Sequence, residues 1–169
     1  PDGWLVAVSW VVVGLSAAQI LLLSFGRDQS IYATVADGIL RGQMPYRDLL
    51  DFKPPGIFLI YALAQALFGK TMLAVRLLEV AGLVGMIFGF MRLSERFFGV
   101  RRVGVIGGAV AALIHAQLEF WHTAQPETFG GFLTVWALVL TACSGKRSRR
   151  LWRWLAIGAL FGAAFLLKP

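Results

Sequence analysis

The chain has 169 residues, of which 58% are hydrophobic and 15% are charged, and its mean hydropathy is +0.72. A soluble domain of this size carries more charge and fewer long apolar runs, so this composition excludes a soluble protein. It predicts an all-α fold, a polytopic integral membrane helix bundle. The net charge of +7 does not indicate a nucleic-acid partner, because the basic residues lie in short loops between apolar runs, where topology and lipid headgroups account for them.

The first predicted membrane span covers residues 4–25, and a polar segment, residues 26–56, follows it. Four of the nine acidic residues lie in this segment, which is therefore the first place to look for chemistry. Within it, residues 29–41 have apolar side chains on one helical stripe but are too polar to cross a bilayer, so they predict an interfacial helix. Gly42 ends that helix, and residues 43–56 are predicted to be extended and stiffened by proline.

The apolar run 57–68 is shorter than the roughly 17 residues that a span needs, so we expect a second interfacial (juxtamembrane) helix in the first outer loop. Four further spans are predicted at residues 72–92, 103–120, 128–143 and 151–167. Three of them carry glycines four residues apart, a spacing that lets membrane helices approach closely. These pairs are Gly85 and Gly89, Gly104 and Gly108, and Gly158 and Gly162.

Whether residues 57–68 cross the membrane decides the topology. If they cross, the two basic loops lie on the same side as the polar segment; if they lie flat, both loops lie on the opposite side. The positive-inside rule favours the flat arrangement. It places the basic loops in the cytoplasm and the polar segment, with the loop ending near Glu127, on the outer face. The basic loop residues are Arg101, Arg102, Lys146, Arg147, Arg149 and Arg150.

Two carboxylates at helix starts are candidates for chemistry. Asp28 has the residue type of a helix N-cap, and the functional alternative is a general base or metal ligand at the membrane surface. Glu127 follows Pro126, and a glutamate in a first helical turn is favourable through the helix dipole without any further function. On the favoured topology, however, Glu127 faces the same compartment as Asp28.

The segment DFKPPG contains the most suggestive cation. Lys53 is either a lysine that reaches the headgroup region or a partner for a lipid phosphate, held in place by two rigid prolines. Tyr46, Arg47 and Asp48 in the preceding PYRD are either turn and surface residues or further parts of the same pocket.

Other polar residues lie within the apolar runs. Arg76 and Glu79 are three residues apart and are predicted to pair on one helix face as a structural feature. His115, Glu119 and His122 have the i, i+4, i+7 spacing of one helical row. This row has the residue types of a metal site, but an interfacial polar stripe is the favoured interpretation.

The order of these features resembles the lipid-linked sugar transferases of the GT-C superfamily, in its protein O-mannosyltransferase and aminoarabinose transferase branch. The resemblance is carried by RDQSIYA, GQMPYRDLLDFKPPG and LFGKTMLAVRL, and it extends from Trp4 to the terminal LLKP. Its most specific part is KPPG, Lys53 to Gly56, twenty-five residues after Asp28. One departure is Asp28-Gln29, where many relatives carry a paired Asp-Glu.

The resemblance implies a fold, an activity and a set of site residues. It implies that residues 1–169 are the N-terminal part of a GT-C-type transmembrane domain, with two juxtamembrane helices in the first outer loop. Asp28 would be the base for the acceptor, Lys53 would lie near the lipid phosphate, and Glu127 would be the second acidic position. Tyr46, Arg47 and Asp48 would complete the substrate site, and Asp28 and Glu127 are the candidate ligands of a divalent metal ion.

We therefore predict a glycosyltransferase of the bacterial inner membrane that moves a sugar from a polyprenyl-phosphate donor to a lipid, glycan or protein acceptor on the outer face. The chain alone, as a fragment, is expected to be inactive. A transporter or flippase-like protein is the alternative, but it would carry its charges near the bilayer midplane on broken helices rather than in loops. A purely structural membrane subunit leaves DFKPPG unexplained.

Overall fold

The computed structural model describes residues 3–143 and 151–168, and within these ranges every regular element is a helix. The all-α prediction is confirmed. The elements are α1 (Gly3–Leu22), α2 (Arg27–Leu40), α3 (Pro55–Phe68), α4 (Met72–Phe98), α5 (Arg101–Gln117), the short 3-10 helix η1 (Glu119–Trp121), α6 (Pro126–Ala142) and α7 (Leu151–Leu167).

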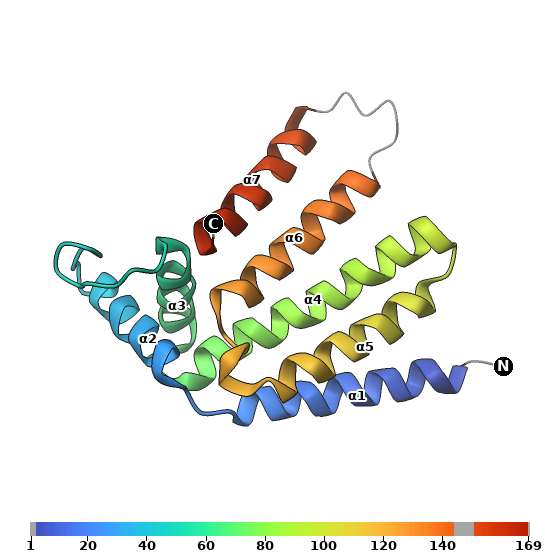
Figure 1. Ribbon diagram of the computed structural model, residues 1–169, viewed down its shortest axis with the longest axis horizontal. Helices are drawn as coiled ribbons and strands as arrows, with labels where there is room; N and C mark the ends of the chain where they lie inside the picture. Colours follow the sequence, from blue (N-terminus) through green and yellow to red (C-terminus); the bar gives the residue numbers. More distant parts are fainter. Residues whose placement is uncertain (1–2, 144–150, 169) are drawn as a thin grey trace.

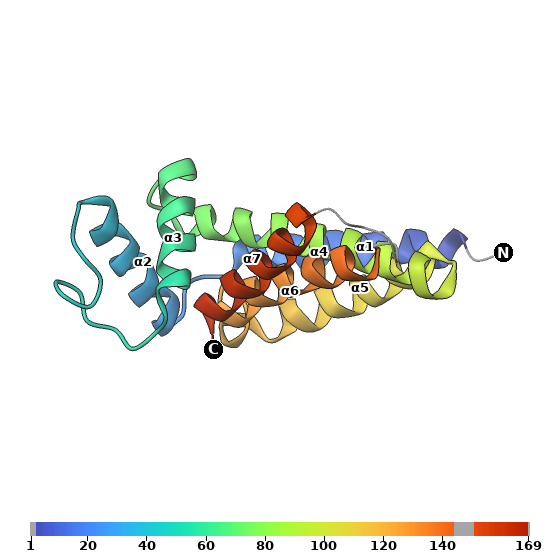
Figure 2. The ribbon, with the colours of Figure 1, turned by 90° about the horizontal axis from the view of Figure 1, so that it is seen from above.

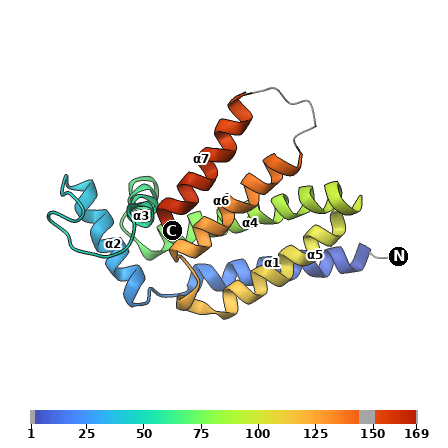
Figure 3. The same ribbon diagram turned by 45° about the horizontal axis from the view of Figure 1, so that its top comes forward.

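Five helices form a fan, in the order α7, α6, α4, α5 and α1, with each helix packed on the next (Figure 1). Helices α2 and α3 pack on each other at one end of this fan, which we call the site end. Helix α3 stands across the direction of the fan helices in Figure 2. Helices α7 and α1 lie at the two outer edges of the fan in Figure 1, and Figure 3 shows α5 crossing α1, on which it packs. The loop between α5 and α6 and the end of α7 also lie at the site end, so segments far apart in sequence meet there.

Close contact between α4 and α5 depends on glycine. A Cβ atom added to Gly104 would lie 2.5 Å from backbone atoms of α4, and one added to Gly108 would lie 2.8 Å from the side chain of Ile87. The close helix approach predicted from Gly104 and Gly108 is confirmed. Around Gly158 and Gly162 a Cβ atom would meet nothing within 4 Å in the part of the chain that the structure describes.

The outside of the fan is apolar. Among the described residues, two helices, α1 and α4, are long and apolar enough to cross a bilayer, and α7 is a shorter apolar helix. Large apolar side chains stay exposed along the fan, among them Trp4, Leu15, Leu22, Phe88, Leu155 and Phe165. Exposed apolar surface of this extent marks contact with a membrane or with further protein.

The ends of the fan carry different residues. The polar segment, both ends of α3 and the start of α6 lie at the site end, whereas Arg101 and Arg102 begin α5 at the other end (Figure 1). Helix α3, which contains residues 57–68, therefore does not run parallel to the fan helices (Figure 2). The second predicted basic loop, with Lys146, Arg147, Arg149 and Arg150, lies outside the described residues.

The structure corrects two local predictions. The segment 43–56 is not simply extended, because residues 44–49 close a tight turn in which the Tyr46 N–H donates to the Leu49 carbonyl at 2.8 Å. The Met44 N–H donates to the Asp48 carboxylate at 2.8 Å, so a side chain within the same turn satisfies this backbone group. Tyr46 has a φ of 68°, which ends the extended conformation there.

The second correction concerns helix ends. Helix α5 stops at Gln117 rather than near residue 120, because Glu119 has a φ of 47° and starts a 3-10 turn. The predicted helical row of His115, Glu119 and His122 is therefore wrong, since only His115 lies on α5. Helix α4, in contrast, continues to Phe98, six residues past its predicted end.

Candidate functional site

Lys53 has a backbone that is held on both sides. The Asp51 carboxylate accepts hydrogen bonds from the N–H groups of Phe52 and Lys53, at 2.6 and 3.1 Å. The Tyr46 hydroxyl donates to the Lys53 carbonyl at 2.7 Å. Immediately afterwards Pro54 caps α3 and fixes its own φ, so the Lys53 side chain leaves the chain from a defined point.

The Lys53 ammonium faces Asp28. Its Nζ lies 4.0 Å from Asp28 Oδ2, with both side chains close to half exposed. An ion pair with this exposure contributes about 0–1 kcal/mol to stability, so the pair matters little for folding. The N-cap interpretation of Asp28 is wrong: Gly26 is the N-cap of α2, and Asp28 lies inside the first turn, where its carboxylate is free to face Lys53.

Gln29 has a different environment from its neighbour Asp28. Its side chain is fully buried, and its amide group donates to the carbonyls of Phe120, at 3.3 Å, and Thr123. A carboxylate at this position would have no N–H to give to these two carbonyls. The Asp28-Gln29 pair therefore combines one exposed carboxylate with one buried tether to the loop that precedes α6.

Glu127 lies in the first turn of α6 and pairs with Lys168, just after the end of α7. Partial burial acts to raise the pKa of the Glu127 carboxyl, but the hydrogen bond from Lys168, a backbone hydrogen bond and the charges of Lys168 and Lys53 hold this pKa below its ordinary value. The partner that contacts Glu127 is Lys168, and the charge of Lys53 adds the smallest of these contributions.

The end of α7 reaches this place because Gly56 has no side chain. A Cβ atom on Gly56 would lie 2.6 Å from the Leu166 carbonyl oxygen, so any other residue would separate α3 from α7. The glycine of KPPG thus brings Lys168 beside Glu127. The sequence interpretation did not single out Lys168, and only its place after an apolar span marked it.

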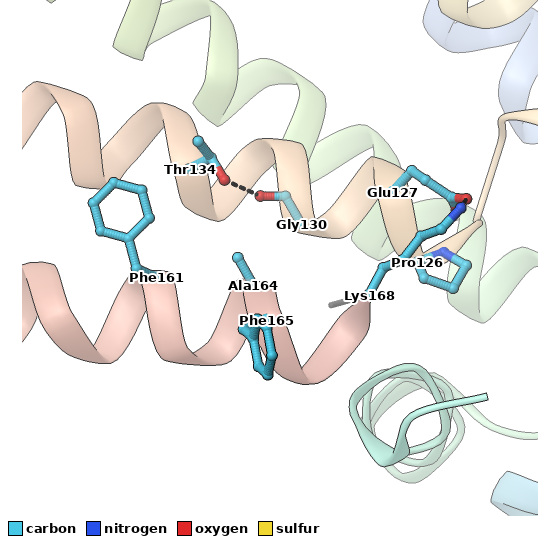
Figure 4. A pocket seen from close by; sticks show the side chains of 8 residues that line it. All are labelled: Pro126, Glu127, Gly130, Thr134, Phe161, Ala164, Phe165 and Lys168. Atoms are coloured by element: carbon cyan, nitrogen blue, oxygen red, sulfur yellow. Dashed lines mark hydrogen bonds and ion pairs between the residues drawn. The ribbon is translucent and has the colours of Figure 1, made fainter.

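A pocket of about 440 Å³ opens between α6 and α7. Figure 4 shows Glu127 and Lys168 meeting at one end of it, with the aromatic rings of Phe161 and Phe165 on the α7 side. The pocket thus has a charged end and an apolar body. Its lining residues are Pro126, Glu127, Gly130, Thr134, Phe161, Ala164, Phe165 and Lys168.

The remaining predicted site residues divide into two groups. Tyr46 contacts Lys53 through its hydroxyl and stacks edge-on against Phe58, with ring centroids 6.3 Å apart. Arg47 and Asp48 instead pair with each other, at 2.9 and 2.8 Å, and this lowers the pKa of the Asp48 carboxyl. The structure therefore brings Asp28, Lys53 and Tyr46 together and leaves the other two as an exposed pair on the adjoining turn.

A buried polar network supports the loop that leads to Glu127. Arg76 pairs with Glu79 at 2.9 Å, as predicted, and both side chains are inaccessible to solvent. The Glu79 carboxylate also contacts His115 Nε2 at 2.9 Å and accepts the Ala124 N–H. Arg76 donates to the carbonyls of Leu23 and Ser24, the first two residues after α1, at 3.3 and 3.2 Å.

Ala124 is the point at which this network meets the loop. It is buried with a φ of 54°, a strained conformation for a residue with a side chain. Its N–H is bound by Glu79, and its carbonyl accepts the Tyr61 hydroxyl at 2.9 Å. Because both backbone groups are held, the chain enters α6 in one direction, which sets the position of Glu127.

A family model described as dolichyl-phosphate-mannose-protein mannosyltransferase matches residues 52–169 of the chain. The chain belongs to this family. The match begins one residue before Lys53 and includes Gly56, Glu127 and Lys168, whereas Asp28 precedes it. The predicted resemblance to GT-C-type transferases is confirmed, and membership of a glycosyltransferase family does not favour a transporter. No curated protein and no solved structure matches the chain.

In this member of the mannosyltransferase family, the two candidate metal ligands each face a lysine. Asp28 is 4.0 Å from Lys53, and Glu127 pairs with Lys168. Within residues 3–143 and 151–168, no group of three or more His, Cys, Asp or Glu side chains gathers to form a metal site. The residues present are therefore arranged as two carboxylate–ammonium pairs.

Proposed function

We propose that this chain is the N-terminal part of an integral membrane glycosyltransferase that moves a sugar from a polyprenyl-phosphate donor to an acceptor hydroxyl on a lipid, glycan or protein. One observation carries the proposal. Lys53, whose backbone is fixed and which lies inside the family match, faces the Asp28 carboxylate at 4.0 Å at one end of an apolar helical fan.

In the proposed reaction the acceptor oxygen attacks the anomeric carbon as the bond between that carbon and the phosphate oxygen breaks. Asp28 takes the proton of the acceptor hydroxyl. The bonding electrons leave with the phosphate, which gains one negative charge, and the Lys53 ammonium offsets that charge. The products are the glycosylated acceptor and the polyprenyl phosphate.

The other site residues have supporting roles in this proposal. Tyr46 holds the Lys53 carbonyl, and Arg47 with Asp48 forms the exposed rim of the donor site. Glu127 borders the pocket between α6 and α7 and is kept ionised by its lysine partner. A divalent metal ion bound by Asp28 and Glu127 is a separate prediction. In the alternative arrangement, Lys53 and Lys168 balance the charges of these two carboxylates.

The proposed membrane placement follows from where the apolar and polar residues lie. The five fan helices would cross the bilayer of a bacterial inner membrane, and α2 and α3 would lie in its interface. The site end would face outward, where the polar residues 26–56 and the loop before α6 meet. A donor with a long apolar chain can then stay in the bilayer while its phosphate reaches Lys53.

The test uses the full-length enzyme in lipid nanodiscs, with a radiolabelled polyprenyl-phosphate sugar and a membrane extract as acceptor source. Asp28→Asn keeps the side-chain shape but cannot take a proton, and we expect kcat to fall about 10²–10⁴-fold. Asp37→Asn is the matched control on the same helix, since Asp37 pairs with Arg41 and Lys70 instead. Activity in Asp28→Asn equal to that in Asp37→Asn would remove the catalytic assignment.

A further inference from the structure

Tyr32 lies at the centre of the site, although the segment RDQSIYA that contains it assigns it no role. It is one turn after Asp28 on α2 and is 1% exposed. The Lys53 Nζ lies over its ring, 6.0 Å from the centroid. Its hydroxyl donates to Gln125 Oε1 at 3.3 Å, two residues before Glu127.

We propose that Tyr32 is a positioning residue for sugar transfer, which fixes the Lys53 ammonium with its ring and the start of α6 with its hydroxyl. The proposal rests on the function proposed above. One buried side chain would then set the relative positions of Asp28 on its own helix α2, Lys53 before α3 and Glu127 on α6.

The surroundings of Tyr32 suit this role. Its ring packs against Tyr61 and Phe58, with centroids 5.6 and 6.1 Å away, so it is held by two further rings. A cation over an aromatic face is attracted by the ring's electron density, and the attraction has a preferred direction, unlike an ion pair between exposed groups. The Tyr32 ring therefore fixes the direction of the Lys53 ammonium, while Asp28 balances its charge.

The hydroxyl has a separate function from the ring. Burial, followed by the charges of Asp28, Asp51 and Glu127, raises the pKa of Tyr32 far above its ordinary value. The phenol therefore stays protonated and donates to Gln125 at any physiological pH. Since Gln125 is the N-cap of α6, this hydrogen bond acts on the helix that carries Glu127.

Two substitutions separate the two functions in the full-length enzyme. Tyr32→Phe keeps the ring and deletes the hydrogen bond, so we expect kcat to fall about two- to tenfold with the donor KM unchanged. Tyr32→Leu also deletes the ring, and we expect the donor KM to rise about two- to fivefold. Phe132→Leu, a buried ring deletion on α6 that does not touch Lys53, controls for general loss of packing.

The decisive experiment combines Tyr32→Leu with Lys53→Ala. If the ring acts through Lys53, Tyr32→Leu leaves the donor KM of Lys53→Ala unchanged, although it raises that of the wild type. Equal effects in both backgrounds, or an effect of Phe132→Leu as large as that of Tyr32→Leu, would overturn the role of the ring. Wild-type kcat in Tyr32→Phe would overturn that of the hydroxyl.

Failure of this proposal differs from failure of the proposed function. If Lys53→Ala itself has normal donor kinetics, the lipid-phosphate site is wrong. If Lys53→Ala raises the donor KM and the ring-deleted enzyme behaves like the wild type, only the role of Tyr32 is wrong. Should Tyr32→Leu not fold, Tyr32→Met is the second ring-deleting variant.

Discussion

Replacing Glu79 by leucine tests how the loop before α6 is held. Glu79→Leu leaves the Arg76 guanidinium buried without its counter-ion, although it keeps the carbonyls of Leu23 and Ser24 as acceptors. Breaking a buried ion pair from one side costs about 3–5 kcal/mol. The Ala124 N–H also loses its acceptor, and leaving such a group buried and unsatisfied costs about 1–3 kcal/mol.

The expected free energy of unfolding therefore falls by about 4–8 kcal/mol, the sum of those two ranges, if the site cannot relax. Glu79→Gln keeps an oxygen for the Ala124 N–H and should cost clearly less than Glu79→Leu. The matched control is Glu95→Leu, which removes the exposed ion pair between Glu95 and Arg101 and should cost about 0–1 kcal/mol.

The assay is reversible unfolding of the full-length protein in mixed micelles. Hydrogen exchange at residues 118–125 is read in parallel, because loss of the Glu79 contact should expose the Ala124 amide in Glu79→Leu but not in Glu95→Leu. A cost for Glu79→Leu within about 0.5 kcal/mol of that for Glu95→Leu, with unchanged exchange, would refute the account of the buried network.

Two further predictions concern α7 and the topology. Gly56→Ala should reduce transfer, because its Cβ atom would lie 2.6 Å from the Leu166 carbonyl oxygen and displace Lys168. The control is Gly131→Ala, whose Cβ atom would meet no described atom within 4 Å, and equal activities of the two variants would contradict the role of Gly56. In a protein whose Cys143 has been replaced, a cysteine at Ser30 should react with an impermeant thiol reagent in intact cells, and one in place of Phe97 should not; labelling of both would exclude the proposed orientation.

The positions of the helices could be predicted from the sequence because apolar runs and glycine or proline boundaries are local signals. Residues 57–68 were predicted to be a separate short helix, and α3 spans Pro55–Phe68. Helix ends were less accurate. The predicted cap at Asp28 failed because the helix already starts at Arg27, directly after its N-cap Gly26, and a glycine has no side chain that would mark the cap in the sequence.

The site was only partly predictable, since its geometry depends on contacts across the chain. Asp28 and Lys53 were expected to act together, and the structure places them 4.0 Å apart. The burial of Gln29 and Tyr32 could not be predicted, because each contacts the loop before α6, about ninety residues further along the chain. Lys168 reaches Glu127 only because of the close approach at Gly56.

The most direct test of the central claim is the donor dependence of transfer in Lys53→Ala. The ion pair of Lys53 is exposed, so this variant should fold, and loss of a charge-assisted contact with the donor phosphate of about 1.5–3 kcal/mol predicts roughly a ten- to hundredfold fall in kcat/KM for the donor. Lys53→Arg should recover only part of the lost kcat/KM, because arginine keeps the positive charge but its planar guanidinium makes different contacts from a compact ammonium.

Lys70→Ala serves as the control, since Lys70 is an exposed lysine that pairs with Asp37 away from Lys53. The account predicts normal donor kinetics in Lys70→Ala and a large loss in Lys53→Ala at equal expression and thermal stability. Unchanged donor kinetics in Lys53→Ala would contradict the lipid-phosphate site.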